Sequence, residues 1–169
     1  MESTLSEERF NFISAENKAF ILAFDKEISK LGYCFGGNIG DGYCWGRYMI
    51  IYSKEGVKSK KVAARIYIRE KSIVLRLFLN NLDKHRKYIE KAPAYIRDVF
   101  TGGHADCKHC HNDKAGVCKF RKTYTLDDKY YEKCNGITFE FPEHDLNKLS
   151  GYIGLLKEFY PVRKADAIA

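Results

Sequence analysis

Residues 106–134 read DCKHCHNDKAGVCKFRKTYTLDDKYYEKC, and this short polar stretch holds four of the six cysteines. Cys107 and Cys110 form a C-x2-C knuckle, Cys118 follows after seven residues, and Cys134 follows after fifteen more. A two-residue gap lets two thiolates converge on one ion while the backbone turns between them. Zinc accepts four such ligands in a closed tetrahedron. The spacing therefore predicts a zinc ion bound by all four cysteines.

A hairpin can bring the second pair of cysteines back to the knuckle. Residues 122–126 and 129–133 alternate and are rich in β-favouring residues, and Asp127-Asp128 between them is a turn candidate. Such a hairpin places Cys134 near Cys118. The spacing resembles that of zinc-ribbon modules in general. Because four cysteines close the coordination shell, such a site has no open position for water or substrate, and we expect it to be structural.

Three histidines lie beside the knuckle and are alternative ligands. His109 is inside it, where it is poorly placed to bind the same ion as both neighbouring cysteines. His104 or His111 is the better substitute for a cysteine. The alternative to any metal is a set of unligated thiols, with or without one disulfide.

Charge is distributed unevenly along the 169 residues, whose formal net charge is +7. Residues 47–122 carry nineteen basic and seven acidic side chains, a net charge of +12, between two mildly acidic ends. This asymmetry suggests an anionic partner, with a solvated basic surface as the alternative. No apolar run is long enough for a membrane helix, and the acidic start has no apolar signal region. We therefore expect a cytoplasmic protein with reduced cysteines.

The order of predicted elements indicates an α+β fold, with an antiparallel sheet packed against helices and a zinc-ribbon-like hairpin insertion. We expect one domain over residues 1–169, with a zinc-binding subdomain over 104–134. Thr4 and Ser14 are the expected caps of an N-terminal helical region. The other predicted elements are strands at 45–52, 62–69, 73–79 and 137–141, and helices at 82–91, 93–100 and 145–160.

A glycine-rich loop over residues 36–42 is flanked by aromatic residues. A phosphate-binding loop needs a helix directly after it, and here a strand-like run follows, so that reading fails. The loop can still border a ligand pocket lined by Tyr43 and Trp45, with Arg76 either as its polar handle or as an arginine packed along its stem. Cys34 and Cys44 lie in apolar surroundings, and we expect both to be buried.

Two function classes follow from these patterns, and a third is weaker. The first is a non-enzymatic, zinc-stabilised binding module for a small molecule or a regulatory ligand. The second is nucleic-acid binding, because basic and aromatic residues interleave along one strand face. An enzyme is the third, but the G-x-S-x-G, H-E-x-x-H and P-loop motifs are all absent. The residues proposed for nucleic-acid contact are Lys60, Lys61, Arg65, Tyr67 and Arg69.

Overall fold

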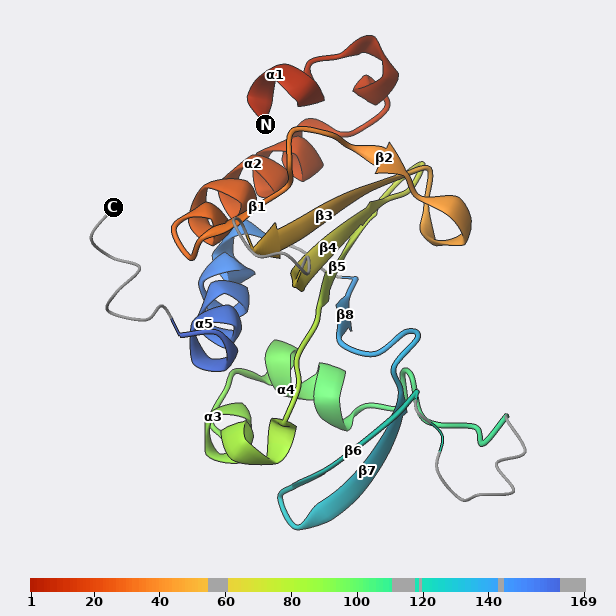
Figure 1. Ribbon diagram of the computed structural model, residues 1–169, viewed down its shortest axis with the longest axis vertical. Coiled ribbons are helices and arrows are strands. Elements are labelled where there is room, and N and C mark those ends of the chain that lie inside the picture. Colours follow the sequence, from red (N-terminus) through yellow and green to blue (C-terminus); the bar gives the residue numbers. More distant parts are fainter. Residues whose placement is uncertain (55–60, 111–117, 119, 143–144, 162–169) are drawn as a thin grey trace. The chain divides into compact units, whose positions relative to one another are not determined.

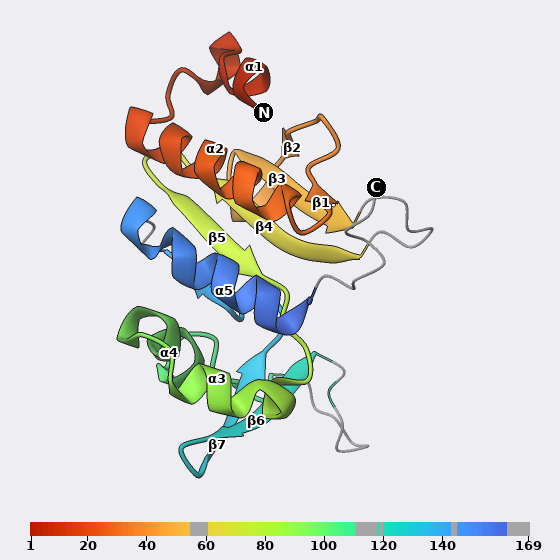
Figure 2. The same cartoon turned by 90° about the vertical axis from the view of Figure 1, so that its left-hand side faces the viewer.

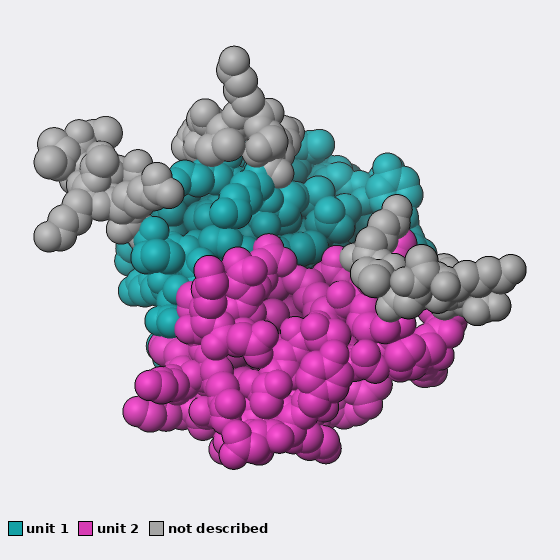
Figure 3. Space-filling model, turned by 60° about the horizontal axis from the view of Figure 1, so that its bottom comes forward, with its two compact units in different colours: residues 1–78, 141–169 teal, residues 79–140 magenta. Residues whose placement is uncertain are grey.

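The computed structural model describes residues 1–54, 61–110, 118, 120–142 and 145–161. Within it the chain forms two compact units. The first comprises residues 1–78 and 141–169, and the second comprises residues 79–140. Figure 3 colours the two units separately. Among the described residues, no helix combines the length and the apolar composition that a membrane crossing needs.

The first unit is built on an antiparallel sheet with the strand order β1-β3-β4-β5-β8, and β2 also pairs with β3 (Figure 1). Residues on β3, β4 and β5 alternate between two faces, and cross-strand pairs such as Arg65 with Arg76 share a face. The strand bounds are β1 Tyr33–Cys34, β2 Gly40–Asp41, β3 Tyr48–Lys54, β4 Val62–Ile68, β5 Ile73–Leu77 and β8 Glu140–Phe141.

Two helices, α2 (Ala15–Ser29) and α5 (Leu149–Phe159), cover one face of this sheet (Figure 2). The Ser14 hydroxyl accepts a hydrogen bond from the Asn17 amide and begins α2 as a side-chain cap. The core between helices and sheet is aromatic, with Phe24 and Tyr52 at 5.3 Å between ring centroids. Shorter helices lie elsewhere in the unit: α1 Glu2–Leu5 and three 3₁₀ helices, Glu8–Phe10, Tyr43–Trp45 and Leu146–Lys148.

The second unit packs short helices with a hairpin. It comprises a 3₁₀ helix Leu82–His85, α3 Arg86–Glu90, α4 Ala94–Thr101, β6 Arg121–Leu126 and β7 Lys129–Cys134. Asp127 and Asp128 both have positive φ, which is the backbone of a type I′ hairpin turn. Tyr124 on β6 is buried, and its hydroxyl donates to the Phe100 carbonyl at the end of α4. The hairpin is therefore joined to the helices by packing and by a hydrogen bond.

The structure confirms the α+β class with an antiparallel sheet packed against helices, and it corrects several local predictions. Thr4 is not a cap, because α1 begins after Met1. Trp45 lies in a 3₁₀ helix instead of a strand. The strand predicted at 137–141 is only β8, since a turn occupies residues 135–139. Cys44 is exposed and Cys34 half-buried, so the burial expected for both was wrong.

Candidate metal centre

Three backbone segments lie side by side at the base of the hairpin, with β7 in the middle. On one side, the Cys107 amide donates to the Glu132 carbonyl at 2.9 Å, and the Cys134 amide donates to the Ala105 carbonyl at 2.7 Å. On the other side, Arg121 pairs with Cys134 in the β6–β7 register. The knuckle segment thus continues the hairpin as a third, short strand-like edge.

Cys118 is brought to the same place by the start of β6. The Arg121 amide donates to the Cys118 carbonyl at 2.9 Å, which turns the chain into the strand. The Asn135 amide donates to the Phe120 carbonyl at 2.6 Å, which extends the pairing beyond Cys134. Backbone hydrogen bonds alone therefore place Cys107, Cys118 and Cys134 on three neighbouring segments.

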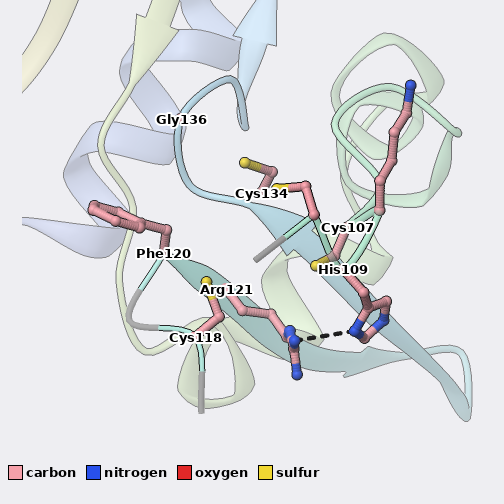
Figure 4. Close-up of a pocket in the computed structure, with 9 residues that line it drawn as sticks. Cys107, His109, Cys118, Phe120, Arg121, Cys134 and Gly136 are labelled. Atoms are coloured by element: carbon pink, nitrogen blue, oxygen red, sulfur yellow. Dashed lines mark hydrogen bonds between the residues drawn. The ribbon is translucent and has the colours of Figure 1, made fainter. Parts of the chain in front are cut away.

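These segments enclose a cavity of about 230 Å³, here called the cysteine cavity. Figure 4 shows Cys107 and Cys134 next to one another and Cys118 across the cavity from them. All four cysteines of the predicted site line this cavity, although they are up to 27 residues apart in sequence (107 to 134). The complete lining is Cys107, Lys108, His109, Cys110, Cys118, Phe120, Arg121, Cys134 and Gly136.

Lys133 holds the segment that precedes the knuckle, residues 102–106, against β7. Its side chain is 0% exposed, and its ammonium group donates to the carbonyls of Gly102 and His104 and to the Asp106 carboxylate. Asp106 also pairs with Lys133 as an isolated β-bridge. One side chain on β7 therefore holds residues 102–106 against the hairpin, directly before Cys107.

His109 is engaged by two charged neighbours. Its Nε2 lies 3.0 Å from a Glu132 carboxylate oxygen, and its Nδ1 lies 3.0 Å from a guanidinium nitrogen of Arg121, a contact drawn in Figure 4. Its φ of 48° places it in the left-handed region, so the backbone turns sharply between Cys107 and Cys110. Both ring nitrogens have neighbours on the hairpin, which favours cysteine over His109 as the ligand.

Of the other alternative ligands, only His104 lies in the described part of the chain. His104 faces Glu140, with 3.5 Å between Nε2 and the carboxylate, and it does not line the cavity. His111 falls outside the described residues. All six cysteines are free thiols, so the cavity holds no disulfide. Within the described residues, no three histidine, cysteine or acidic side chains are close enough together to hold a metal ion.

Two of the three predicted ligand-pocket residues, Trp45 and Arg76, come together in the first unit. Arg76 is buried, with its guanidinium carbon 5.7 Å from the Trp45 ring centroid. Its Nη1 donates to the Tyr67 hydroxyl at 3.2 Å, so protein groups already contact this arginine. Tyr43, in contrast, is 81% exposed. A small-molecule ligand at these residues stays a prediction.

The predicted nucleic-acid residues are only partly brought together. Arg65 is half-buried and Tyr67 fully buried on the same face of β4, and Arg69 follows the end of that strand as an exposed residue. Lys61 is exposed, but its ammonium group lies over the Tyr160 ring. Lys60 falls outside the described residues.

Sequence reasoning missed the residues that support the cysteine cavity. Lys133, Glu132 and Arg121 read as ordinary charged positions of an exposed hairpin. One signal was available, because period-two alternation puts Lys133 on the same side of β7 as Tyr131, a residue that packs. The backbone acceptors of Lys133 lie about thirty residues away, and no local pattern reveals them.

Comparisons with known proteins identify no relative, because no protein-family model, curated protein or solved structure matches this chain.

Proposed function

We propose that this protein is a non-enzymatic binding module of the cytoplasm, in which a zinc ion on Cys107, Cys110, Cys118 and Cys134 holds the second unit folded. The observation that carries the proposal is that all four cysteines line one cavity. They reach it from three adjacent backbone segments, which is how a knuckle and a hairpin supply ligands to one ion. The donor set is also chemically apt, since thiolates are the ligands that structural zinc prefers.

The geometry around the cavity supports cysteine as the whole ligand set. His109 points at Glu132 and Arg121, and His104 at Glu140. Binding would bring four thiols from the cavity wall to one ion as thiolates, and their protons would be released to solvent.

The proposed role of the metal is structural. The second unit is built from short helices and one hairpin, and an isolated two-stranded hairpin is at best marginally stable. A metal bound only by the folded form adds its binding free energy to stability. With four protein ligands, zinc has no open position for substrate, so the metal serves the fold and the ligand of the module binds elsewhere.

Cobalt titration of the reduced, metal-free protein tests the ligand set. Four thiolates around Co²⁺ give strong charge-transfer absorption and intense tetrahedral bands, with an end point at about one ion per chain. Cys118→Ser should lose much of the charge-transfer intensity, while Cys44→Ser, which changes an exposed thiol in the other unit, should match the wild type. Equal spectra for Cys118→Ser and Cys44→Ser would refute the four-cysteine site.

A further inference from the structure

The face of the sheet turned away from α2 and α5 carries a distinctive set of side chains. Residues that alternate with the helix-facing Tyr52, Ala64 and Leu77 belong to this second face. We call it the arginine–aromatic face and define it by Trp45, Arg65, Tyr67, Arg76 and Phe78.

Aromatic rings and guanidinium groups alternate across this face. Arg76 lies 5.7 Å from the Trp45 ring centroid and 4.8 Å from the Phe78 ring centroid, so it sits between the two rings. The guanidinium carbon of Arg65 lies 5.1 Å from the centroid of the same Phe78 ring. Rings and cations therefore alternate in the order Trp45, Arg76, Phe78, Arg65. A single nucleic-acid strand presents a matching alternation of flat bases and anionic phosphates.

Contacts within the protein hold this face in place, but they leave part of its aromatic and basic surface exposed. Trp45 stacks on Tyr67 with 5.5 Å between centroids and 16° between planes. The Arg69 Nε donates to the Trp45 carbonyl at 3.0 Å and fixes the 3₁₀ helix that carries the indole. Trp45, Arg65 and Phe78 nevertheless remain partly exposed, and the buried Nε of Arg65 has no hydrogen-bond partner in the described chain.

Charge on the three central strands has one sign. β3, β4 and β5 carry Lys54, Arg65 and Arg76 and no acidic residue. Arg65 and Arg76 are direct cross-strand partners, an arrangement of like charges that is unfavourable in a sheet. Packing explains the buried Tyr67 and Arg76, and Arg65 packs on the Phe78 ring. An anion over the face would in addition compensate the charge of the two adjacent arginines.

We propose that the arginine–aromatic face binds single-stranded nucleic acid. Bases stack on the exposed parts of Trp45 and Phe78, and Arg65, which contacts Phe78 but not Trp45, binds the phosphate next to the base on Phe78. Arg69 at the end of β4 extends the positive charge along the strand. Because every residue of the face is in the first unit, this site does not require the proposed zinc ion, and the two proposals can fail separately.

The single tryptophan of the chain gives a direct readout. Oligo(dT) and oligo(rU) should each quench Trp45 fluorescence, and the comparison shows whether the sugar matters. For about two phosphates bound, log K should fall against log salt with a slope of about −1.4. Binding of short duplex DNA should be much weaker, because paired bases cannot stack on the rings. Oligonucleotide binding that leaves Trp45 fluorescence unchanged would overturn the proposal.

Variants test the roles by anisotropy of a labelled oligo(dT). Trp45→Ala should bind about tenfold more weakly, with most of the affinity retained in Trp45→Phe. Arg65→Gln should weaken binding and reduce the salt slope by about 0.7, one phosphate for a single strand. Lys26→Gln is the matched control, since it removes one exposed charge on α2, which covers the opposite face. Equal binding by Arg65→Gln and Lys26→Gln, or no oligonucleotide binding at all, would refute the site.

Discussion

Lys133 makes the hydrogen bonds that hold residues 102–106, the segment before the knuckle, against the hairpin. Lys133→Met keeps the length of the side chain but leaves the Gly102 and His104 carbonyls without their donor. We expect the free energy of unfolding to fall by about 2 to 4 kcal/mol, measured by urea titration. Lys129→Met, at an exposed position of the same strand, should change it by less than about 0.5 kcal/mol. Equal stability of the two variants would contradict this role.

Asp25 gives the first unit a predictable pH dependence. Burial raises the pKa of this half-buried carboxyl on α2 above 3.8, and burial raises the pKa of the adjacent Tyr52. Because its pKa is raised in the folded state, the neutral Asp25 carboxyl contributes its full stability below pH 3.8. This contribution is lost as pH rises through the folded-state pKa. Asp25→Asn, which stays neutral, should therefore gain stability relative to the wild type as pH rises.

Urea titrations over a pH series measure that difference. Glu27→Gln is the control of opposite sign, because the side-chain hydrogen bond from Lys30 lowers the pKa of Glu27. Its stabilising contribution is present above pH 4.5 and lost as pH falls through the folded value. A free-energy difference between Asp25→Asn and the wild type that does not vary with pH would show that the Asp25 charge has no effect.

Among the elements, the tip of the β6–β7 hairpin is attached to α3 by the Glu90 carboxylate and by an ion pair between Arg86 and Asp128. Glu90 accepts from the Asp127 amide at 2.9 Å and is paired with Arg86. The Asp127 amide, and secondarily Arg86, lowers the pKa of Glu90 below 4.5. The contribution of the Glu90 carboxylate to this attachment is present above pH 4.5 and is lost as pH falls through the folded-state pKa of Glu90.

Hydrogen exchange at the Asp127 amide tests the attachment. Glu90→Ala should lower its protection roughly fivefold, because the acceptor is removed. Glu90→Gln keeps an oxygen acceptor, so the protection of the Asp127 amide in this variant should lie between those in the wild type and in Glu90→Ala. In the wild type, the chemical shift of this amide should titrate with a midpoint below pH 4.5. Unchanged protection in Glu90→Ala would show that the hairpin tip is held by other contacts.

Elements with strong local signals were predictable, and those shaped by distant contacts were not. Alternation and the Asp127-Asp128 turn predicted the hairpin, and Ser14 predicted the start of α2. The strand predicted through Trp45 failed because Arg69 and Tyr67, far along the chain, hold that residue in a 3₁₀ helix. Cys44 in the same helix is consequently exposed, although its neighbours are apolar.

The candidate sites show the same division. Cysteine spacing predicted a four-cysteine zinc site. The structure places all four side chains around one cavity, but no three metal-ligating side chains of the described residues are close enough together to hold an ion, so the zinc site stays a prediction. Their common location depends on backbone pairing between residues 105–107 and 132–134, which only the folded chain reveals. Likewise, alternation predicted that Arg65 and Tyr67 share a strand face, but the contribution of Trp45 and Phe78 to that face depends on cross-strand packing.

In the molecule as a whole, the two units have separate proposed roles. The first carries the larger sheet and the proposed nucleic-acid face, and the second carries the cysteine cavity. Chelation should therefore unfold the second unit while the first keeps its structure. Near-ultraviolet circular dichroism and Trp45 fluorescence, recorded with and without a strong chelator, measure the two effects. If the fluorescence of Trp45 changed to that of an unfolded chain when the metal was removed, the two units would not be independent in stability.

The most direct test of the central claim is the zinc content of protein purified under reducing conditions without added metal, measured together with its reactive thiols. We expect about one zinc ion per chain, with four thiols protected until a chelator is added. Cys134→Ser should lose the zinc and Cys44→Ser should keep it. Protein without zinc and with all six thiols reactive, or equal zinc in both variants, would refute the four-cysteine zinc site.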